Sequence, residues 1–155
     1  MLPLKFFVGL GNPDTKYQNT RHNIGQAIIQ HLPQAKNFLI TDTYMNESGI
    51  FVQKLVHFYK INPSNLYLVH DDLDLGVGEW RLQFDRGPAG HHGVESVIQH
   101  LGTQAFWRFR VGIGHPLDPT PVEDYVLRPF TSAEIPIINQ TIDKIAAEIL
   151  KLSGH

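Results

Sequence analysis

A histidine, an amide and a carboxylate each follow a short apolar run of this chain. Asn12 and His22 come after the run Phe6–Leu10, and Asp71 comes directly after a second run, Leu66–His70. A neutral imidazole, with an ordinary pKa of about 6.5, can take a proton from water at neutral pH. A carboxylate bonded to its other nitrogen fixes the tautomer and stabilises the cation that forms. His22 is therefore a candidate general base, and Asp71 is its candidate partner.

The elements that must position these residues follow from the pattern of apolar residues. Strands are expected over 6–10, 38–41, 66–70, 79–84 and 106–113. Helices are expected after Thr20, from 46–48 onward, over 92–101 and from about Thr131 to Leu152. This alternation predicts a single α/β domain over residues 1–155, with a mixed, mostly parallel, twisted sheet and helices on both faces. Because sites gather beyond the carboxyl ends of such strands, the segments 11–12, 70–72 and 112–115 are expected to meet.

Two of the expected helices carry more detailed predictions. In the helix that opens at 46–48, Ile50, Leu55 and Phe58 are expected to face inward. In the last helix, isoleucine and leucine recur at three- and four-residue steps, which is typical of a helix with one buried face. Thr131 and Glu134, just before it, have the spacing of a capping box.

Composition limits the class of protein. The chain has 155 residues, of which 42% are hydrophobic and 18% charged, which suits a soluble globular domain. It has no cysteine, which excludes disulfides and thiolate metal sites, and no apolar run near the ~20 residues of a membrane span. Its start lacks the pattern of a signal peptide, so a cytoplasmic location is expected. With a net charge of −2, any nucleic-acid footprint must be local, and the candidates are Arg81, Arg86, Arg108 and Arg110, on segments that could hold a phosphate or simply face solvent.

Several of these residues also have simpler interpretations. His22 could merely cap or pack a helix end, and Asn12 could make an Asx turn before Pro13. Asn46 could cap a helix instead of meeting a ligand. The run His70–Asp74 could be a solvated acidic turn or a Mg²⁺ site. The segment GLGNP lacks both a third glycine and the Gly-Lys-Ser/Thr of a phosphate loop, which disfavours a nucleotide site there.

Six segments, taken in order, resemble the motifs of bacterial-type peptidyl-tRNA hydrolases. They are VGLGNPDTKYQNTRHNIG at 8–25, TYMNESG at 43–49, HDDLDLGVG at 70–78, RGPAGHHGVESVIQHLG at 86–102, RFRVGIGHP at 108–116 and EDYVLRPF at 123–130. The order holds along almost the whole chain, so the resemblance is far more specific than any single motif.

This resemblance implies an activity and a set of roles. Such enzymes cleave the ester between a peptide and the 3′ ribose of tRNA, and they need no metal or other cofactor. By matching motifs, the catalytic residues would be His22 as general base, Asp71 as its orienting carboxylate, and Asn12. The substrate would be held by Tyr17, Tyr44, Asn46, His91 and His92, and the tRNA phosphates by Arg81 and Arg110. A cytoplasmic monomer acting on peptidyl-tRNA is expected.

The chain also departs from the pattern of that family. His92 stands where the family has asparagine, Gln83 where lysine is common, and Asp72 where glutamate is usual. The segment between His22 and Asn46 is shorter, which predicts a smaller sheet with an edge that needs covering. Two alternatives therefore stay open. One is a catalytically weak or inactive RNA-binding relative, motivated by His92 and Gln83, and the other is a small nucleotide-binding protein, motivated by GLGNP alone.

Overall fold

The strands form one central sheet. The computed structural model describes residues 2–155. Its strands are β1 (Phe6–Gly9), β2 (Phe38–Ile40), β3 (Leu66–Asp72), β4 (Trp80–Phe84) and β5 (Trp107–Gly112), in the spatial order β2-β1-β3-β5-β4. Every neighbouring pair is parallel except β4 with β5, which is antiparallel. The expected mixed, mostly parallel sheet is therefore confirmed.

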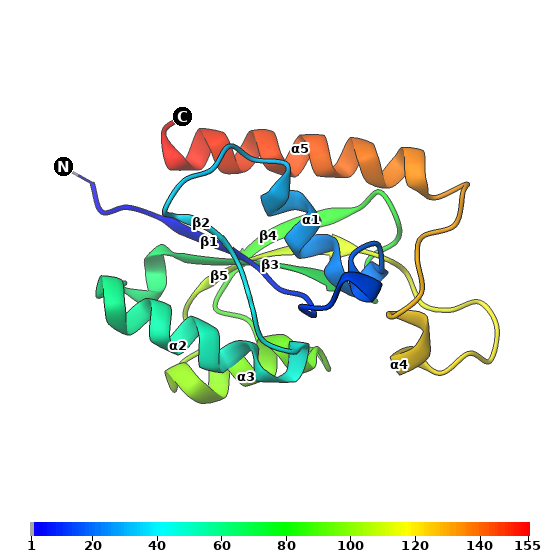
Figure 1. Ribbon diagram of the computed structural model, residues 1–155, viewed down its shortest axis with the longest axis horizontal. Helices are drawn as coiled ribbons and strands as arrows, with labels where there is room; N and C mark the ends of the chain where they lie inside the picture. The colour runs from blue at the N-terminus through cyan, green and yellow to red at the C-terminus, as the bar shows by residue number, and fades with distance from the viewer. Residues whose placement is uncertain (1) are drawn as a thin grey trace.

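Helices cover both faces of this sheet (Figure 1). In that view α1 (Ile24–Gln30) and α5 (Ile135–Ser153) lie above the sheet, and α2 (Ser48–Tyr59) and α3 (His92–Leu101) lie below it. A short helix, α4 (Val122–Tyr125), stands apart at the right-hand end. Single 3₁₀ turns are η1 (Thr15–Tyr17), η2 (Arg21–Asn23), η3 (Met45–Glu47) and η4 (Pro63–Asn65). Among residues 2–155, no helix combines the length and the apolar character that crossing a bilayer requires.

Alternate residues of the strands build two apolar cores, one on each face of the sheet. In β3, Tyr67 and Val69 pack toward α1 and α5, whereas Leu66 and Leu68 pack toward α2 and α3. All four are at most 4% exposed. The whole of β3 is buried, including the polar residues His70, Asp71 and Asp72 at its carboxyl end.

Helix α2 is rotated differently from the expectation. Leu55 is buried as expected, but the prediction was wrong for Ile50 and Phe58, which are 36% and 76% exposed. The buried face of α2 instead runs through Gly49, where an added Cβ would collide with the carbonyl oxygen of Ser96 in α3. This close approach of two helix backbones sets the rotation of α2 about its axis. The rotation cannot be predicted from the spacing of large apolar residues, because glycine is not one of them.

The start of α5 agrees with the predicted capping box. The backbone N–H of Thr131 donates to Glu134 Oε1 at 2.9 Å, and the N–H of Glu134 donates to Thr131 Oγ1 at 3.3 Å. The helix then begins at Ile135, with Pro136 in its first turn, where a missing N–H costs no helical hydrogen bond.

The β2 edge of the sheet is short. Only the three residues of β2 lie at this edge. Asn37 secures them, because its Nδ2 donates to the Lys5 carbonyl at 2.9 Å and its own carbonyl accepts from the Phe7 N–H at 2.8 Å. The ring of His155 packs 5.3 Å from that of Phe38. A strand this short exposes few unpaired backbone groups, which limits edge-to-edge pairing without a covering helix.

The order of the strands creates a crevice between β1 and β3. The chain leaves β1 through α1 to reach β2 on one side, and then crosses through α2 to β3 on the other side. Such a reversal opens a crevice at the carboxyl ends of the two central strands. Asn12 follows β1 and Asp71 lies at the end of β3, so both reach this crevice.

Candidate active site

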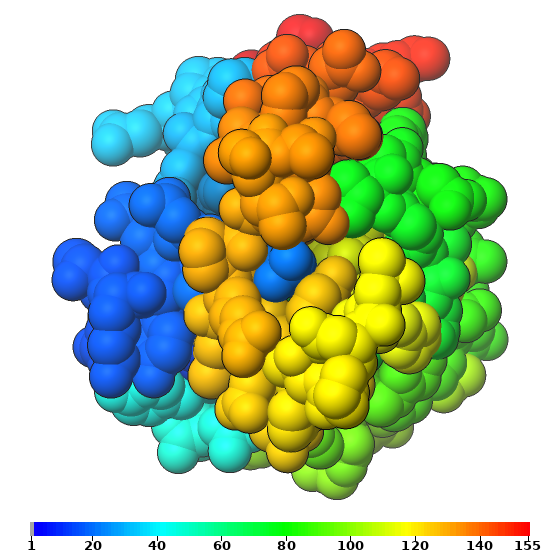
Figure 2. Space-filling view, turned by 90° about the vertical axis from the view of Figure 1, so that its right-hand side faces the viewer, coloured from blue at the N-terminus to red at the C-terminus, as the bar shows by residue number. Residues whose placement is uncertain are grey.

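A cleft of about 500 Å³ opens at the carboxyl ends of β1 and β3. Figure 2 looks onto this end of the molecule, where the yellow and orange segments between β5 and α5 lie in the middle, flanked by blue and green chain. The cleft lining includes every residue predicted for catalysis or substrate binding: Asn12, Tyr17, His22, Tyr44, Asn46, Asp71, His91 and His92. The two predicted phosphate contacts, Arg81 and Arg110, lie outside this lining.

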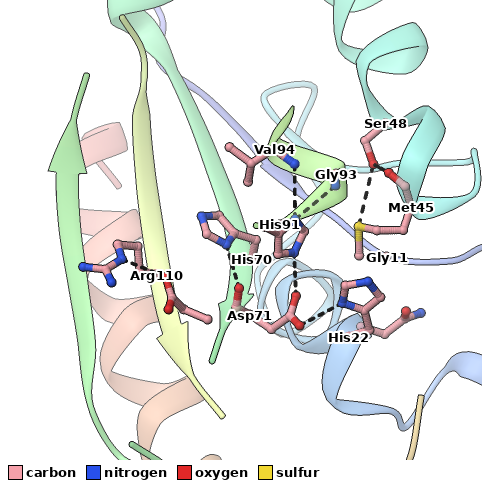
Figure 3. Close-up of polar contacts among 12 residues, drawn as sticks. Gly11, His22, Met45, Ser48, His70, Asp71, His91, Gly93, Val94 and Arg110 are labelled. Atoms are coloured by element: carbon pink, nitrogen blue, oxygen red, sulfur yellow. Dashed lines mark hydrogen bonds and ion pairs between the residues drawn. The ribbon is translucent and has the colours of Figure 1, made fainter. Parts of the chain in front are cut away.

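Asp71 joins two imidazoles inside the cleft (Figure 3). Its Oδ2 lies 2.8 Å from His22 Nδ1, and its Oδ1 lies 2.8 Å from His91 Nε2. The other nitrogen of His91, Nδ1, accepts from the backbone N–H groups of Gly93 and Val94 at 3.1 and 3.2 Å. Neutral His91 therefore carries its proton on Nε2 and donates it to Asp71. His22 likewise donates from Nδ1, which leaves its Nε2 as an unprotonated base.

Electrostatics keep Asp71 ionised and make His22 more basic. Burial alone would raise the pKa of Asp71, but His22 and His91 hold that pKa well below the ordinary aspartate value. Burial alone would lower the pKa of His22, but the Asp71 carboxylate outweighs it and raises this pKa above the ordinary 6.5. The cation that His22 forms on taking a proton is therefore stabilised where it forms.

Close backbone packing brings His22 to Asp71. A Cβ on Gly9 would collide with the backbone of Gly25 at the start of α1, and a Cβ on Gly25 would collide with the Val69 carbonyl of β3. The glycines therefore let α1 approach β1 and β3 closely enough for η2 to deliver His22. This gives the first glycine of GLGNP a packing role instead of a phosphate-binding one.

The backbone of His22 is held by a distant part of the chain. Its N–H donates to the Val126 carbonyl at 2.8 Å, and the N–H of Arg21 donates to the Arg128 carbonyl at 3.0 Å. The same segment, just after α4, supplies part of the cleft wall through Val126 and Leu127. The base and one wall of the cleft are thereby fixed to each other.

The side chain of Arg21 strengthens this connection. It is 5% exposed, and its guanidinium lies 4.0 Å from the centre of the Tyr125 ring. It donates to the Tyr125 carbonyl at 3.2 Å and to Glu134 at 3.1 Å. Arg21 is adjacent to His22 in sequence, yet it points away from the cleft toward α4 and α5. The sequence offers no signal for this role beyond that adjacency.

Asn12 is fixed by contacts to two loops. Its backbone N–H and carbonyl bond to the side-chain amide of Asn23, both at 2.9 Å. Its Oδ1 accepts from the N–H of Met45 at 2.8 Å. The Asx-turn interpretation of Asn12 is therefore wrong, because its side chain links the loop after β1 to η3. Its Nδ2 has no partner among residues 2–155, which makes it an available donor.

The remaining predicted substrate-binding residues lie around the opening. Asn46 is exposed in η3, and the cap position of α2 is occupied by Glu47, so the helix-cap alternative for Asn46 is wrong. His92 is exposed as the first residue of α3. The hydroxyl of Tyr44 donates to Asp14 Oδ2 at 2.9 Å, on the side of the cleft toward η1.

The acidic run after β3 does not form one oxygen-rich cluster. Asp72 accepts from Arg110 Nε at 2.8 Å, and Asp74 lies 3.0 Å from His115 Nε2, whereas Asp71 bonds to the two imidazoles. Asp71 and Asp72 are only 2% and 9% exposed, so the interpretation as a solvated turn is wrong for these two residues. Neighbouring side chains of a strand leave on opposite faces, which separates their partners.

One group in the described chain has ligand atoms close enough for a metal ion. It consists of His22, Asp71 and His91, whose ligand atoms lie within 4.8 Å of one another. These atoms are already joined by the two imidazole protons, and an ion bound there would have to replace both of them.

The predicted phosphate-binding arginines have different surroundings. Arg81 of β4 and Arg110 of β5 are opposite each other in the sheet register and so share a face. The side chain of Arg81 is 54% exposed, whereas Arg110 is buried and bonds to Asp72 and Gln83 at 2.8 Å each. Arg108 is also buried, so the solvent-facing alternative is wrong for both arginines of β5. Their contact with phosphate stays a prediction.

His70 supports the site from behind. Its Nδ1 donates to the Asp71 carbonyl at 2.8 Å, and its ring centre lies 4.8 Å from that of His91. Burial, with a smaller effect of His91, lowers the pKa of His70 to about 3. The ring is therefore neutral at working pH and packs beneath His91. In sequence it belongs to the acidic run, which gives no indication of this packing role.

Comparisons with known proteins identify the family of this chain. The family model described as peptidyl-tRNA hydrolase matches residues 6–42 and 37–154. The peptidyl-tRNA hydrolase of Bacillus cereus (strain Q1) is 40% identical over 166 aligned positions, covering 92% of this chain and 89% of the relative. That of Nitrosomonas eutropha is 39% identical, with 92% and 85% covered.

Solved structures give the same result. The crystal structure of peptidyl-tRNA hydrolase from Acinetobacter baumannii superimposes with a TM-score of 0.86 at 32% identity, covering 97% of this chain and 88% of that one. A hydrogenase maturation protease from Thermococcus kodakarensis shares only the fold, with a TM-score of 0.53 at 12% identity. The two stretches of the family match meet at 37–42, within the segment predicted to be shortened. By sequence and by fold, the chain belongs to the peptidyl-tRNA hydrolase family.

Proposed function

We propose that this chain hydrolyses the ester between a peptide, or an N-blocked amino acid, and the 3′ ribose of tRNA. The observation that carries the proposal is the 2.8 Å hydrogen bond from His22 Nδ1 to the buried carboxylate of Asp71. This bond orients the imidazole, raises its basicity and leaves Nε2 available in a cleft that can receive an ester. The membership of the family supports the choice of peptidyl-tRNA as substrate.

In the proposed reaction His22 Nε2 takes a proton from water while the water oxygen attacks the ester carbonyl. The imidazolium that forms is stabilised by Asp71. The tetrahedral intermediate then collapses, the bond between the carbonyl carbon and the ribose oxygen breaks, and His22 returns its proton to the departing 3′ oxygen. The products are a peptide with a free carboxyl group and tRNA with a free 3′ hydroxyl. Residues of this chain supply every proton transfer in this scheme.

Amide groups would hold the ester and stabilise the oxyanion. Asn12 is the stronger candidate, because its Oδ1 is fixed by Met45 and its Nδ2 has no partner among residues 2–155. Asn46, at the opening, would hold the peptide backbone with Tyr17 and Tyr44. His92 replaces an amide with an imidazole, whose neutral form offers one donor and one acceptor on different nitrogens, so it would keep one contact of the usual asparagine.

The tRNA would lie toward β4 and β5. Arg81 is the more available of the two predicted phosphate contacts, since Arg110 is buried and already engaged by Asp72 and Gln83. Arg110 would then act mainly by stabilising the pairing of β4 with β5, which positions Arg81. We further propose that the chain works as a monomer, because one copy contains every residue invoked above. We propose the cytoplasm as its location, since its substrate is a product of translation.

Release of an N-acetylated amino acid from tRNA tests this function. We expect His22→Ala to lower the rate by a factor of about 10³ or more, since general base catalysis and support by Asp71 are lost together. His57→Ala, at an exposed histidine of α2, is the matched control and should keep the wild-type rate. A chelator should not affect either rate.

Two results would contradict the proposal. Release that continues in a folded His22→Ala variant would exclude His22 as the base. No release by folded wild type, together with binding of unacylated tRNA that tightens at low salt, would favour the RNA-binding relative that His92 and Gln83 suggest.

A further inference from the structure

A second hollow, of about 290 Å³, adjoins the cleft on the side of β2. We call it the side groove; among the residues that line it are buried Asn12, Asn23, Gln26 and Thr41 and exposed Asp14 and Asp42. Asn12 lines both the cleft and the side groove, so the two hollows adjoin at this residue. No lysine or arginine of residues 2–155 lines the side groove.

Gln26 presents a fixed acceptor in the side groove. This residue is 6% exposed, and its Nε2 donates to the carbonyl and the hydroxyl oxygen of Thr41 at 3.0 and 3.2 Å. Thr41 is held in turn, because its hydroxyl donates to the Gly11 carbonyl at 3.3 Å. The Oε1 atom of Gln26 accepts no hydrogen bond from residues 2–155. An amide fixed in this way is suited to a ligand that brings an N–H group.

The rim of the side groove adds negative charge. Asp42 has no hydrogen bond or ion pair with any described residue, and Asp14 accepts only from the hydroxyl of Tyr44, at 2.9 Å. Two carboxylates and the Gln26 carbonyl therefore face the same hollow without a cation. This arrangement attracts an ammonium group and repels a phosphate.

The position of the side groove indicates which part of the substrate would bring an ammonium group. β2 and β4 lie at opposite edges of the sheet, with the cleft at the ends of β1 and β3 between them. If the tRNA phosphates lie toward Arg81 on β4, the acyl part of the ester must extend the other way, past Asn12. Tyr44 lines the cleft and Asp14 lines the side groove, so their hydrogen bond spans the boundary between the two hollows.

We propose that the side groove binds the protonated amino end of a short peptidyl group. This inference rests on the proposed function and adds a specificity to it: free-amino peptides a few residues long are favoured over the same peptides with a blocked amino end. The Gln26 carbonyl and the Asp42 carboxylate accept from the ammonium group, and Asp14 contributes a second negative charge.

Two dipeptidyl-tRNAs that differ only in N-terminal acetylation test the specificity. We expect wild type to favour the free-amino substrate by about threefold in kcat/KM, the size of effect that a partly exposed ion pair gives. Asp42→Asn should bring this ratio close to one. Asp143→Asn, which removes an exposed carboxylate on α5 outside the side groove, is the matched control and should keep the ratio. Equal kcat/KM for the two substrates in wild type, or a ratio that survives Asp42→Asn, would overturn the proposal.

A binding measurement separates this proposal from the proposed function. A free-amino dipeptide and its N-acetylated form are titrated into the protein while the side-chain amide resonances of Gln26 are followed by NMR. We expect those resonances to move with the free-amino dipeptide alone. If they stay in place, the side groove does not bind ammonium groups, whatever the hydrolysis assay gives. If they move while neither ester is cleaved, only the proposed function fails.

Discussion

Asp71 and Asp72 are consecutive residues of one buried strand, and each bonds to a nitrogen at 2.8 Å. Burial would raise the pKa of either, and in both cases the partner outweighs burial and holds the pKa below the ordinary value. The partners differ in one property. His22 can lose and regain a proton near neutral pH, whereas the guanidinium of Arg110 keeps its protons. Asp71 and Asp72 are both buried, but only the pair of Asp71 with His22 can take up and release a proton near neutral pH.

This difference depends on the register of the strand. Side chains alternate between the two faces of a sheet, so a shift by one residue would turn Asp71 toward the face of Arg110 and Asp72 toward the face of His22. The pairing of β3 with β1 and β5, which fixes that register, is thus part of the machinery of the site. We therefore expect the substitution of aspartate by asparagine to have different effects on activity and stability at positions 71 and 72.

Asp71→Asn should have the largest effect on activity. The amide keeps the shape of the carboxylate but has no negative charge to stabilise the cation of His22. We expect kcat to fall by a factor of about 10²–10⁴ in single-turnover hydrolysis of N-acetyl-aminoacyl-tRNA. Circular dichroism checks that the variant is folded. A folded variant with more than a tenth of the wild-type rate would contradict the role given to Asp71.

The pH dependence of kcat/KM sharpens this prediction. The base must be neutral to act, so activity is lost as the pH falls through the pKa of His22, which Asp71 raises above the ordinary 6.5. We expect the acid limb of the wild-type profile to have its midpoint above that value. In Asp71→Asn the residual activity should show this limb at lower pH, because burial then acts without the carboxylate. A limb that does not move would mean that another group controls it.

His91→Asn should have an intermediate effect. Asparagine can keep the cap of α3, because it is a favoured N-cap residue, but it loses the Nε2 donor to Asp71. We expect kcat/KM to fall by about tenfold, which corresponds to one hydrogen bond to a charged group. His91→Ala removes both functions and should unfold at a lower temperature than His91→Asn. Equal activity of wild type and His91→Asn would show that Asp71 needs only His22.

Asp72→Asn should have the smallest effect on activity and a clear effect on stability. We expect kcat/KM within about threefold of wild type, but a free energy of unfolding lower by about 3 kcal/mol, because buried Arg110 loses its counter-charge. Because the pKa of Asp72 is lower in the folded state, its stabilising contribution is present at neutral pH and is lost as the pH falls through that pKa. Denaturant unfolding at neutral and acidic pH should therefore show the gap between wild type and variant shrinking in acid. A gap that grows in acid would contradict the ion pair.

The parts of the fold that depend on local pattern could be predicted from the sequence. Buried strands, the capping box at Thr131 and the meeting of His22 with Asp71 follow from apolar runs and from the geometry of parallel sheets. The burial of Arg108 and Arg110 could not be predicted, because it depends on partners outside the strand pattern. Arg108 bonds to the Gln104 carbonyl and lies over the Phe106 ring, and Arg110 bonds to Asp72 and Gln83. Phe58 was misplaced for a similar reason, since Gly49 sets the rotation of its helix.

The role of His91 also lay beyond what its sequence position indicates. The resemblance to the family suggested a substrate contact for His91, but its partners are the backbone of the following helix and a carboxylate from a strand. Pattern predicts which residues come to the edge of the sheet. It does not predict which of several histidines there will share one aspartate, because that depends on the side-chain positions of three separate elements.

The anchoring of His22 has a consequence for the time at which this chain becomes active. While it is being translated, the chain is itself a peptide esterified to tRNA. The backbone of His22 forms its hydrogen bond with Val126, and the side chain of Arg21 forms its hydrogen bonds with Tyr125 and Glu134. All three partners are synthesised more than a hundred residues later. These contacts can therefore form only after the chain has been synthesised as far as Glu134 and that segment has left the ribosome. Until those residues have been synthesised, a nascent copy lacks the contacts that hold its candidate base in place.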